Sequence, residues 1–225
     1  MTKKVLFALT SHRELGNTGR TTGFYVPEVA HPAAVFSAAG YEISYVSVAG
    51  GAAPQDGVNA DDEIVTAFLA DPATRQALAT TPTPAQLTAT DYDVLYFAGG
   101  HGTMWDFPDA KELAELAAAV YDNGGVVAAV CHGPAGLVNI RLRDGSYLVA
   151  DKQVSSFTND EEAAVGLTEV VPFLLQDKLV ERGGRHTGAP NFAEHAVADR
   201  RLVTGQNPAS AKRVAELALE ELADA

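Results

Sequence analysis

Short apolar runs and longer amphipathic stretches alternate along the chain. Residues 4–9 and 42–48 are rich in β-branched and aromatic side chains and are predicted to be strands. Residues 92–98 and 125–130 are almost continuously apolar, which is typical of strands buried on both faces of a parallel sheet. Between them, residues 111–121 place Leu and Ala side chains on one helical face. Strand, helix and strand with short connections predict a right-handed βαβ unit.

The remaining segments extend this pattern. Asn207 and Pro208 favour the start of a final helix, with an N-cap followed by a proline at the first helical position. Residues 147–157 and 197–203 are interpreted as strand pairs or edge hairpins. Residues 50–90, rich in Ala, Thr, Pro and Asp, are either a linker or, as we expect, a variable helical insertion. The fold class predicted is therefore α/β: a doubly wound, mostly parallel, flavodoxin-like sheet sandwiched by helices, forming a single domain over residues 1–225.

Composition narrows the classes of function. Of the 225 residues, 47% are hydrophobic and 20% charged, which is typical of a globular protein. The formal net charge of -13 disfavours nucleic-acid partners and anionic membrane surfaces. The longest uncharged stretch, residues 123–140, contains Gly, Pro and His and is a poor membrane span. A lone cysteine and the lack of a signal-peptide pattern predict a cytoplasmic protein.

The single cysteine, Cys131, lies where a predicted strand meets a sharp turn. Residues 126–134 resemble the strand–turn–helix elbow of Gly-x-Ser-x-Gly enzymes, with the small residues Ala129 and Gly133 on either side of the cysteine. Peptide N–H groups at the start of a helix predicted from Pro134 favour negative charge. We therefore expect a reactive thiol with a pKa below about 8.5. The alternative is a buried cysteine that only fills space.

Two neighbouring segments bring polar groups to the same sheet edge. His132 could act as an acid or base, or could merely bond neighbouring carbonyls. The loop Gly99-Gly100-His101 follows the preceding strand, and its glycines permit close approach of a ligand. We expect the N–H groups of Gly100 and His132 to form an oxyanion hole, with Gly99 and His101 beside the substrate. The loop lacks the spacing of a dinucleotide or ATP motif, so no cofactor is expected.

An acid partner is offered by two segments. Glu28 lies in an apolar, proline-flanked stretch, and burial would raise its pKa and suit it to exchange protons. The alternative is an ordinary carboxylate at a helix start. The acidic run Asp160-Glu161-Glu162 predicts a capped first helical turn. It offers a second acid partner for His132 if Glu28 lies elsewhere.

Other candidates are weighed against simpler interpretations. His101, His132 and Cys131 fit no structural-zinc spacing, so no metal site is expected. Trp105 and Phe107 either wall a pocket or pack in the core. The two remaining late histidines, His186 and His195, are expected at the surface.

Taken in order along nearly the whole chain, several segments resemble the ThiJ/PfpI superfamily, whose fold is like that of class I glutamine amidotransferases. The resemblance is strongest to its heat-shock protein 31-like glyoxalase III group. The segments that carry it are residues 3–11, 27–32, 98–103, 124–134 and 202–210.

This resemblance implies a Cys-His-Glu site, which maps onto Cys131, His132 and Glu28. It also implies conversion of methylglyoxal and related 2-oxoaldehydes to 2-hydroxy acids, without glutathione, metal or cofactor. For some members it implies deglycase or chaperone activity, with glycated or misfolded proteins as partners, and homodimers are frequent. Residues 50–90 correspond to the variable region that shapes the pocket.

Two other classes of function remain open from the sequence. One is a stress-related chaperone or redox sensor in which oxidation of Cys131 changes partner binding. The other is a cysteine amidase or peptidase, which requires a cleft wide enough for a chain. Glutaminase chemistry is disfavoured because no late His-x-Glu pair is present.

Overall fold

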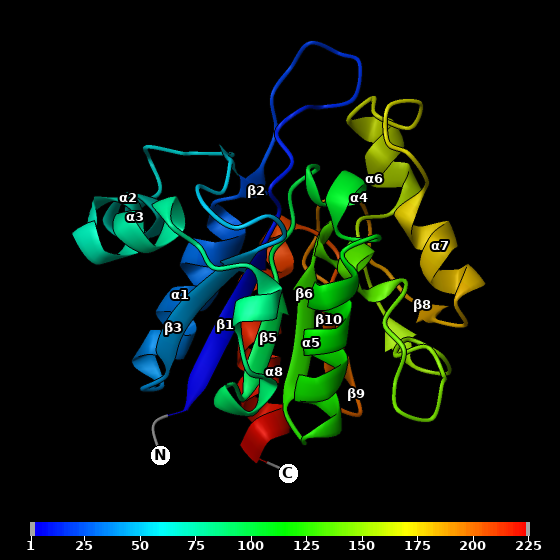
Figure 1. Ribbon diagram of the computed structural model, residues 1–225. Coiled ribbons are helices and arrows are strands. Elements are labelled where there is room, and N and C mark those ends of the chain that lie inside the picture. Colours follow the sequence, from blue (N-terminus) through cyan, green and yellow to red (C-terminus); the bar gives the residue numbers. More distant parts are fainter. Residues whose placement is uncertain (1–2, 224–225) are drawn as a thin grey trace.

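Six strands form a central sheet in the order β3-β1-β5-β6-β10-β9 (Figure 1). All neighbouring pairs are parallel except β10 and β9, which run antiparallel at one edge. This computed structural model describes residues 3–223. The strands are β1 (Lys4–Leu9), β3 (Glu42–Ser47), β5 (Val94–Phe97), β6 (Val126–Val130), β9 (Ala196–Asp199) and β10 (Leu202–Gly205). The mainly parallel α/β architecture predicted from the sequence is confirmed.

Helices cover both faces of the sheet, which explains the continuous apolar runs. In β1, Val5 and Phe7 face the layer of α1 (Pro27–Ala38) and α8 (Ala211–Ala223). Leu6 and Ala8 alternate with them and face the layer of α5 (Lys111–Asp122). In Figure 1, α5 lies in front of the sheet and α8 behind it. Strand β1 therefore buries both of its faces.

Residues 50–90 contain short elements beside α1 (Figure 1). Strand β4 (Gln55–Asp56) pairs with β2 (Phe24–Tyr25) just ahead of α1. Asp62 caps α2 (Glu63–Ala70), and Asp71 caps α3 (Pro72–Ala79) with its side chain, so both helix starts follow from their sequence. Two 3-10 turns, η1 (Pro84–Gln86) and η2 (Ala89–Asp91), lead back to β5.

The prediction for residues 147–157 is largely wrong. Only β7 (Gln153–Val154) is a strand there, and it pairs in parallel with β8 (Arg185–His186) instead of folding into a hairpin. Leu148 and Val149 are fully buried, but they lie in a turn. The remaining elements of this half are α4 (Thr103–Asp106), η3 (Gly133–Leu137), α6 (Asn159–Ala164), α7 (Leu175–Glu181) and η4 (Pro208–Ser210).

The hairpin predicted within residues 197–203 is confirmed as β9 and β10. Its two turn residues, Arg200 and Arg201, have φ values of 52° and 65°, as a tight hairpin turn requires. The structure adds that β10 also pairs with β6, inside the sheet. The final helix starts later than predicted: Pro208 begins the 3-10 turn η4, and α8 follows from Ala211.

Within residues 3–223, no helix is both long enough and apolar enough to cross a bilayer.

Candidate active site

Cys131 lies at the sharp turn that follows β6. Its φ of 59° is left-handed, an uncommon conformation for a residue with a side chain. Gly133 makes the turn possible, because a Cβ there would stand 2.3 Å from the carbonyl oxygen of Phe97. The α-helix predicted from Pro134 is only the 3-10 turn η3. The sharp turn at Cys131 is present as predicted, but the helical segment that follows it is shorter than predicted.

His132 connects the cysteine to an acid. Its Nδ1 lies 3.3 Å from Cys131 Sγ, and its Nε2 lies 2.7 Å from Oε2 of Glu162. Glu162 belongs to the capped acidic turn of α6, where the Thr158 hydroxyl accepts a hydrogen bond from the N–H of Glu161. Of the acids considered from the sequence, Glu28 and the run Asp160-Glu161-Glu162, Glu162 is therefore the one bonded to His132.

The protonation of this group follows from its surroundings. Burial opposes ionisation of Glu162, but hydrogen bonds from His101 and His132 outweigh it and lower its pKa to about 2. Burial and the nearby His101 lower the pKa of His132 to about 4, so its ring is neutral at neutral pH. Because a carboxylate can only accept hydrogen bonds, Nε2 of His132 carries the proton. The Nδ1 lone pair then faces the Cys131 thiol.

His101 bonds the other oxygen of the same carboxylate. Its Nε2 lies 2.9 Å from Oε1 of Glu162, and its ring centre lies 4.0 Å from that of His132. Thr103 fixes the backbone of both loops, since its hydroxyl donates to the carbonyl oxygens of Gly100 and His132. Phe157, with its ring centre 4.4 Å from that of His132, packs against the same imidazole.

Glu28 lies in the first turn of α1 and is fully buried. Gly99 packs against both acids: a Cβ on Gly99 would stand 2.3 Å from Oε2 of Glu28 and 2.9 Å from Cβ of Cys131. Within residues 3–223, neither carboxyl oxygen of Glu28 has a hydrogen-bond partner of good geometry. Burial therefore raises the pKa of Glu28 to about 8, although the Cys131 thiol and the Gly99 amide partly offset the rise.

The expectation of a lowered Cys131 pKa is wrong. Burial raises the pKa of the thiol well above its ordinary value, and the negative charge of Glu28 raises it further. The N–H of His132 acts in the opposite direction but is outweighed. Two buried acids in contact cannot both ionise easily. At neutral pH the pair therefore holds its protons, and a thiolate has to be formed by proton transfer during a reaction.

Two main-chain amides near the elbow, those of Gly100 and His132, were expected to bind a substrate oxygen. Gly100 has a φ of 105°, and a Cβ there would stand 2.2 Å from the carbonyl oxygen of Gly23. Within residues 3–223, neither the Gly100 N–H nor the His132 N–H donates to a main-chain carbonyl. The oxyanion hole expected from these two amides stays a prediction.

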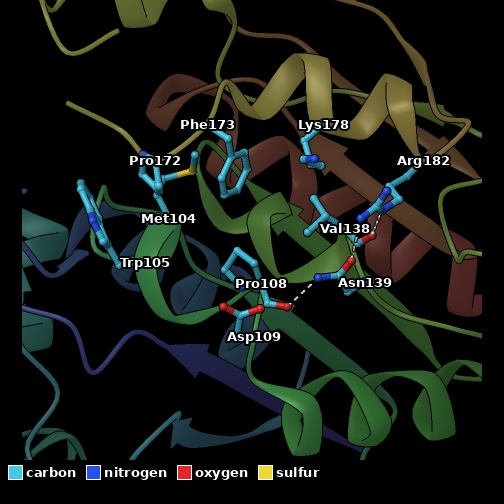
Figure 2. A pocket seen from close by; sticks show the side chains of 10 residues that line it. All are labelled: Met104, Trp105, Pro108, Asp109, Val138, Asn139, Pro172, Phe173, Lys178 and Arg182. Carbon is cyan, nitrogen blue, oxygen red and sulfur yellow. Dashed lines mark hydrogen bonds between the residues drawn. The ribbon is translucent and has the colours of Figure 1, made fainter. Parts of the chain in front are cut away.

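Access to the sulfur is narrow. Cys131 is 5% exposed and His132 1%, whereas the His101 side chain retains 20%. A separate cavity of about 290 Å³ is lined by Met104 and Trp105 of α4, among others, and by no residue of the site (Figure 2). Figure 2 shows Trp105 on its wall, whereas Phe107 packs in the core against Phe97.

The late histidines are not simple surface residues. His186 is partly buried, and burial lowers its pKa, while its Nε2 accepts a hydrogen bond from the N–H of Ser156. His195 is also partly buried, with Nε2 3.0 Å from the Thr187 hydroxyl. The expectation of two surface histidines is therefore wrong, but neither contacts Cys131.

Sequence reasoning missed two members of the site. Thr103 and Phe157 hold His132 in place, but a threonine in a loop and a phenylalanine after an apolar run carry no signal of such a role. Glu162 could be named as a candidate because it lies in an acidic turn with the sequence of a helix cap. Its bond to His132 could not be predicted, because it joins two segments that are distant in the sequence.

The chain is similar in sequence and in structure to known proteins. The model of the DJ-1/PfpI family matches residues 21–221. The glutathione-independent glyoxalase HSP31 of Saccharomyces cerevisiae is 35% identical, over 98% of both chains. Among solved structures, glyoxalase III from Candida albicans is 33% identical with a TM-score of 0.89, over 97% of both chains. The Rapid Encystment Protein 24 kDa of Francisella tularensis is 37% identical with a TM-score of 0.94, over 98% of this chain and 99% of that one.

Proposed function

The chain belongs to the DJ-1/PfpI family, and on that premise we propose that it is a glutathione-independent glyoxalase. It converts methylglyoxal and related 2-oxoaldehydes to 2-hydroxy acids without a cofactor. The names of two similar proteins support this activity. The observation that carries the proposal is the buried carboxyl of Glu28, with a pKa of about 8, packed beside the Cys131 thiol. An isomerisation that moves one proton between neighbouring carbons needs such a pair.

The reaction begins at the sulfur. Nδ1 of His132, 3.3 Å away, takes the thiol proton as Sγ of Cys131 bonds to the aldehyde carbon. Glu162 stabilises the imidazolium that forms, because it is ionised and bonded to Nε2. The aldehyde oxygen gains the negative charge and is held by the Gly100 and His132 amides. It then takes the proton of the Glu28 carboxyl, which gives a hemithioacetal and leaves Glu28 as a carboxylate.

Glu28 performs the proton transfer. As the carboxylate formed in the previous step, it removes the hydrogen from the carbon bonded to sulfur, while the His132 imidazolium protonates the ketone oxygen, which gives an enediol. Glu28 then delivers its proton to the neighbouring carbon. The hydroxyl on the carbon bonded to sulfur loses its proton to His132, and the product is a thioester of the 2-hydroxy acid. A carboxyl with a pKa near neutrality can both take and return the proton. Water then cleaves the thioester, which releases the acid and restores the thiol.

The narrow approach to Cys131 supports a small substrate. With 5% of the residue exposed, a free dicarbonyl can reach the sulfur more readily than an extended chain can. This disfavours the peptidase alternative, which needs an open cleft. The raised pKa of Cys131 also disfavours the redox-sensor alternative, because oxidation requires an exposed thiolate. A deglycase would have to admit glycated side chains through the same opening.

The test is lactate formation from methylglyoxal in the absence of glutathione. The wild type is expected to form lactate, and Cys131→Ala and Glu28→Gln to lose turnover. Glu63→Gln is the matched control, because Glu63 is also in the first turn of a helix but is exposed. Glyoxal, glutamine, a glycated peptide and a model peptide complete the panel. Unchanged rates in both site variants, or release of ammonia without lactate, would contradict the proposal.

A further inference from the structure

We propose that His101, His132 and Glu162 form a binding site for a divalent transition-metal ion such as Zn²⁺, and that the bound ion inhibits turnover. The binding stands on the side-chain arrangement alone. The inhibition rests on the proposed function, because it assumes that His132 moves protons.

The three side chains converge as metal ligands do. One ligand atom from each lies within 4.8 Å of the others. The two nitrogen–oxygen separations are 2.7 and 2.9 Å, and both involve Nε2. With metal–ligand bonds of about 2.1 Å, ligands of a tetrahedral site stand about 3.4 Å apart. A movement of roughly half an ångström at each histidine therefore makes room for an ion between atoms that now share protons. Two imidazoles and one carboxylate are a donor set that zinc and other divalent transition metals accept.

The charge balance at the cluster also favours a cation. Both oxygens of Glu162 bond histidine side chains, and imidazole rings can bind a metal ion as neutral ligands. The adjacent Glu161 is buried as well and accepts hydrogen bonds from Thr158, Asn207 and Gln206. Within residues 3–223, neither carboxyl group forms a salt bridge with a lysine or arginine. These buried groups thus have no fixed positive charge paired with them, and a divalent ion would supply one.

The cluster has an approach from solvent. His101 retains 20% of its side-chain surface, against 5% for Glu162 and 1% for His132. An ion can therefore meet His101 first and keep water as its fourth ligand on the open side. Below the ion, Nδ1 of His132 remains 3.3 Å from Cys131 Sγ and can hold the ring in place.

Inhibition follows from the tautomer. In the free protein, Nε2 of His132 carries the proton and Nδ1 offers its lone pair to the thiol. When the ion takes Nε2, the proton moves to Nδ1, so neither nitrogen can accept the thiol proton or activate water. Each histidine stays neutral in this exchange, and no proton need leave the protein.

The sequence did not predict this site. His101, His132 and Glu162 come from the loop after β5, the elbow after β6 and the first turns of α6. Metal-binding motifs are recognised by short spacings along one segment, whereas this donor set assembles only in the folded chain.

Co²⁺ is the direct probe, because its visible bands are far stronger in a four-coordinate protein site than in water. The full-length wild type, titrated at neutral pH, is expected to show these bands and to saturate at a single equivalent. His101→Ala and Glu162→Gln are expected to lose them. His31→Ala is the matched control, since His31 also bonds a carboxylate, Asp62, at 2.7 Å but has no second histidine ligand beside it. That variant should retain the bands. Circular dichroism of each variant checks its fold, and Glu162→Gln preserves side-chain shape in case His101→Ala does not fold.

Zn²⁺ is expected to displace Co²⁺ and to abolish lactate formation, with recovery on adding a chelator. Bands that are absent in the wild type, or that persist in both site variants, would overturn the metal site. Binding without loss of turnover would overturn the inhibition. If the wild type forms no lactate, the proposed function fails, whereas the cobalt spectra still decide the metal site.

Discussion

Nε2 of His132 lies 2.7 Å from Oε2 of Glu162, a residue 30 positions further along the chain. This bond gives His132 its tautomer, and it separates the roles of two acids. Glu162 orients the histidine that faces Cys131, while Glu28 packs beside the cysteine. The first acid is held ionised by hydrogen bonds, and the second is held protonated by burial. An orienting group and a proton carrier need these opposite environments.

Glu162→Gln should lower kcat for methylglyoxal by about 100-fold or more, with little change in KM. The amide cannot accept strong hydrogen bonds from both histidines, and it carries no charge to stabilise an imidazolium. Steady-state kinetics measures the effect. Asp160→Asn, an exposed neighbour in the same helical turn, is the control and should retain wild-type turnover. Equal kinetics for Glu162→Gln and wild type would show that the bond has no catalytic role.

Glu28→Gln should change stability in a pH-dependent way. The folded-state pKa of Glu28 is raised from its ordinary 4.5 to about 8, so the folded chain binds a proton more tightly than the unfolded chain. The contribution of this proton to the free energy of unfolding is fully present below pH 4.5 and is lost as pH rises through about 8. The complete loss corresponds to about 5 kcal/mol. The neutral amide that Glu28→Gln introduces does not titrate, so the variant does not undergo this loss.

Urea unfolding of both proteins across this pH range measures the difference. Glu28→Gln should match the wild type in mild acid and exceed its free energy of unfolding by several kcal/mol in mild alkali. A difference independent of pH would contradict the raised pKa.

The sheet could be predicted because its sequence signal is local. Residues 92–98 and 125–130 are apolar on both faces, and only a strand between two helical layers uses such a run. The sequence signal for the Cys131 elbow is equally local, since small residues on either side of a cysteine after a buried strand favour a sharp turn. An apolar run by itself predicts burial better than it predicts a strand. Leu148 and Val149 are buried in a turn, and their run was misinterpreted as a strand.

The polar contacts of the site could not be predicted, because they join distant segments. Asn207 illustrates this: it has the sequence of an N-cap, yet its side-chain amide donates to Glu161 Oε1 and to the carbonyl oxygen of Ala193. The pKa of Cys131 was misjudged for the same reason. A helix start was visible in the sequence, whereas the buried Glu28 carboxyl against the sulfur was a matter of packing.

Gly99→Ala should remove activity by displacing Glu28. The new Cβ would stand 2.3 Å from Oε2 of Glu28 and 2.6 Å from the carbonyl oxygen of Val130, and the backbone oxygen cannot swing away. We expect a loss of about 3 kcal/mol in stability and loss of lactate formation in the protein that still folds. Thermal unfolding and turnover measure the two effects.

Gly40→Ala is the control for this change. Gly40 has a φ of 81°, and no atom lies within 4 Å of the point where a methyl group would stand, so alanine there brings backbone strain without a clash. It should cost about 1 kcal/mol and leave turnover intact. Equal effects of the two substitutions on turnover would contradict the role of Gly99 in leaving room for Glu28 beside Cys131.

Alkylation of Cys131 by a small reagent should report the charge of Glu28. Burial raises the pKa of the thiol in both the wild type and Glu28→Gln, but only the wild type adds the repulsion of a neighbouring carboxylate. The pH at which alkylation becomes fast should therefore be lower in Glu28→Gln. Mass spectrometry of samples quenched over a pH series measures the rates, and Cys131→Ala confirms the site of modification. Because the chain has a single cysteine, no other thiol contributes. A midpoint that is unchanged, or higher in the variant, would mean that the Glu28 carboxylate does not raise the pKa of Cys131, and the proposed chemistry would lose its basis.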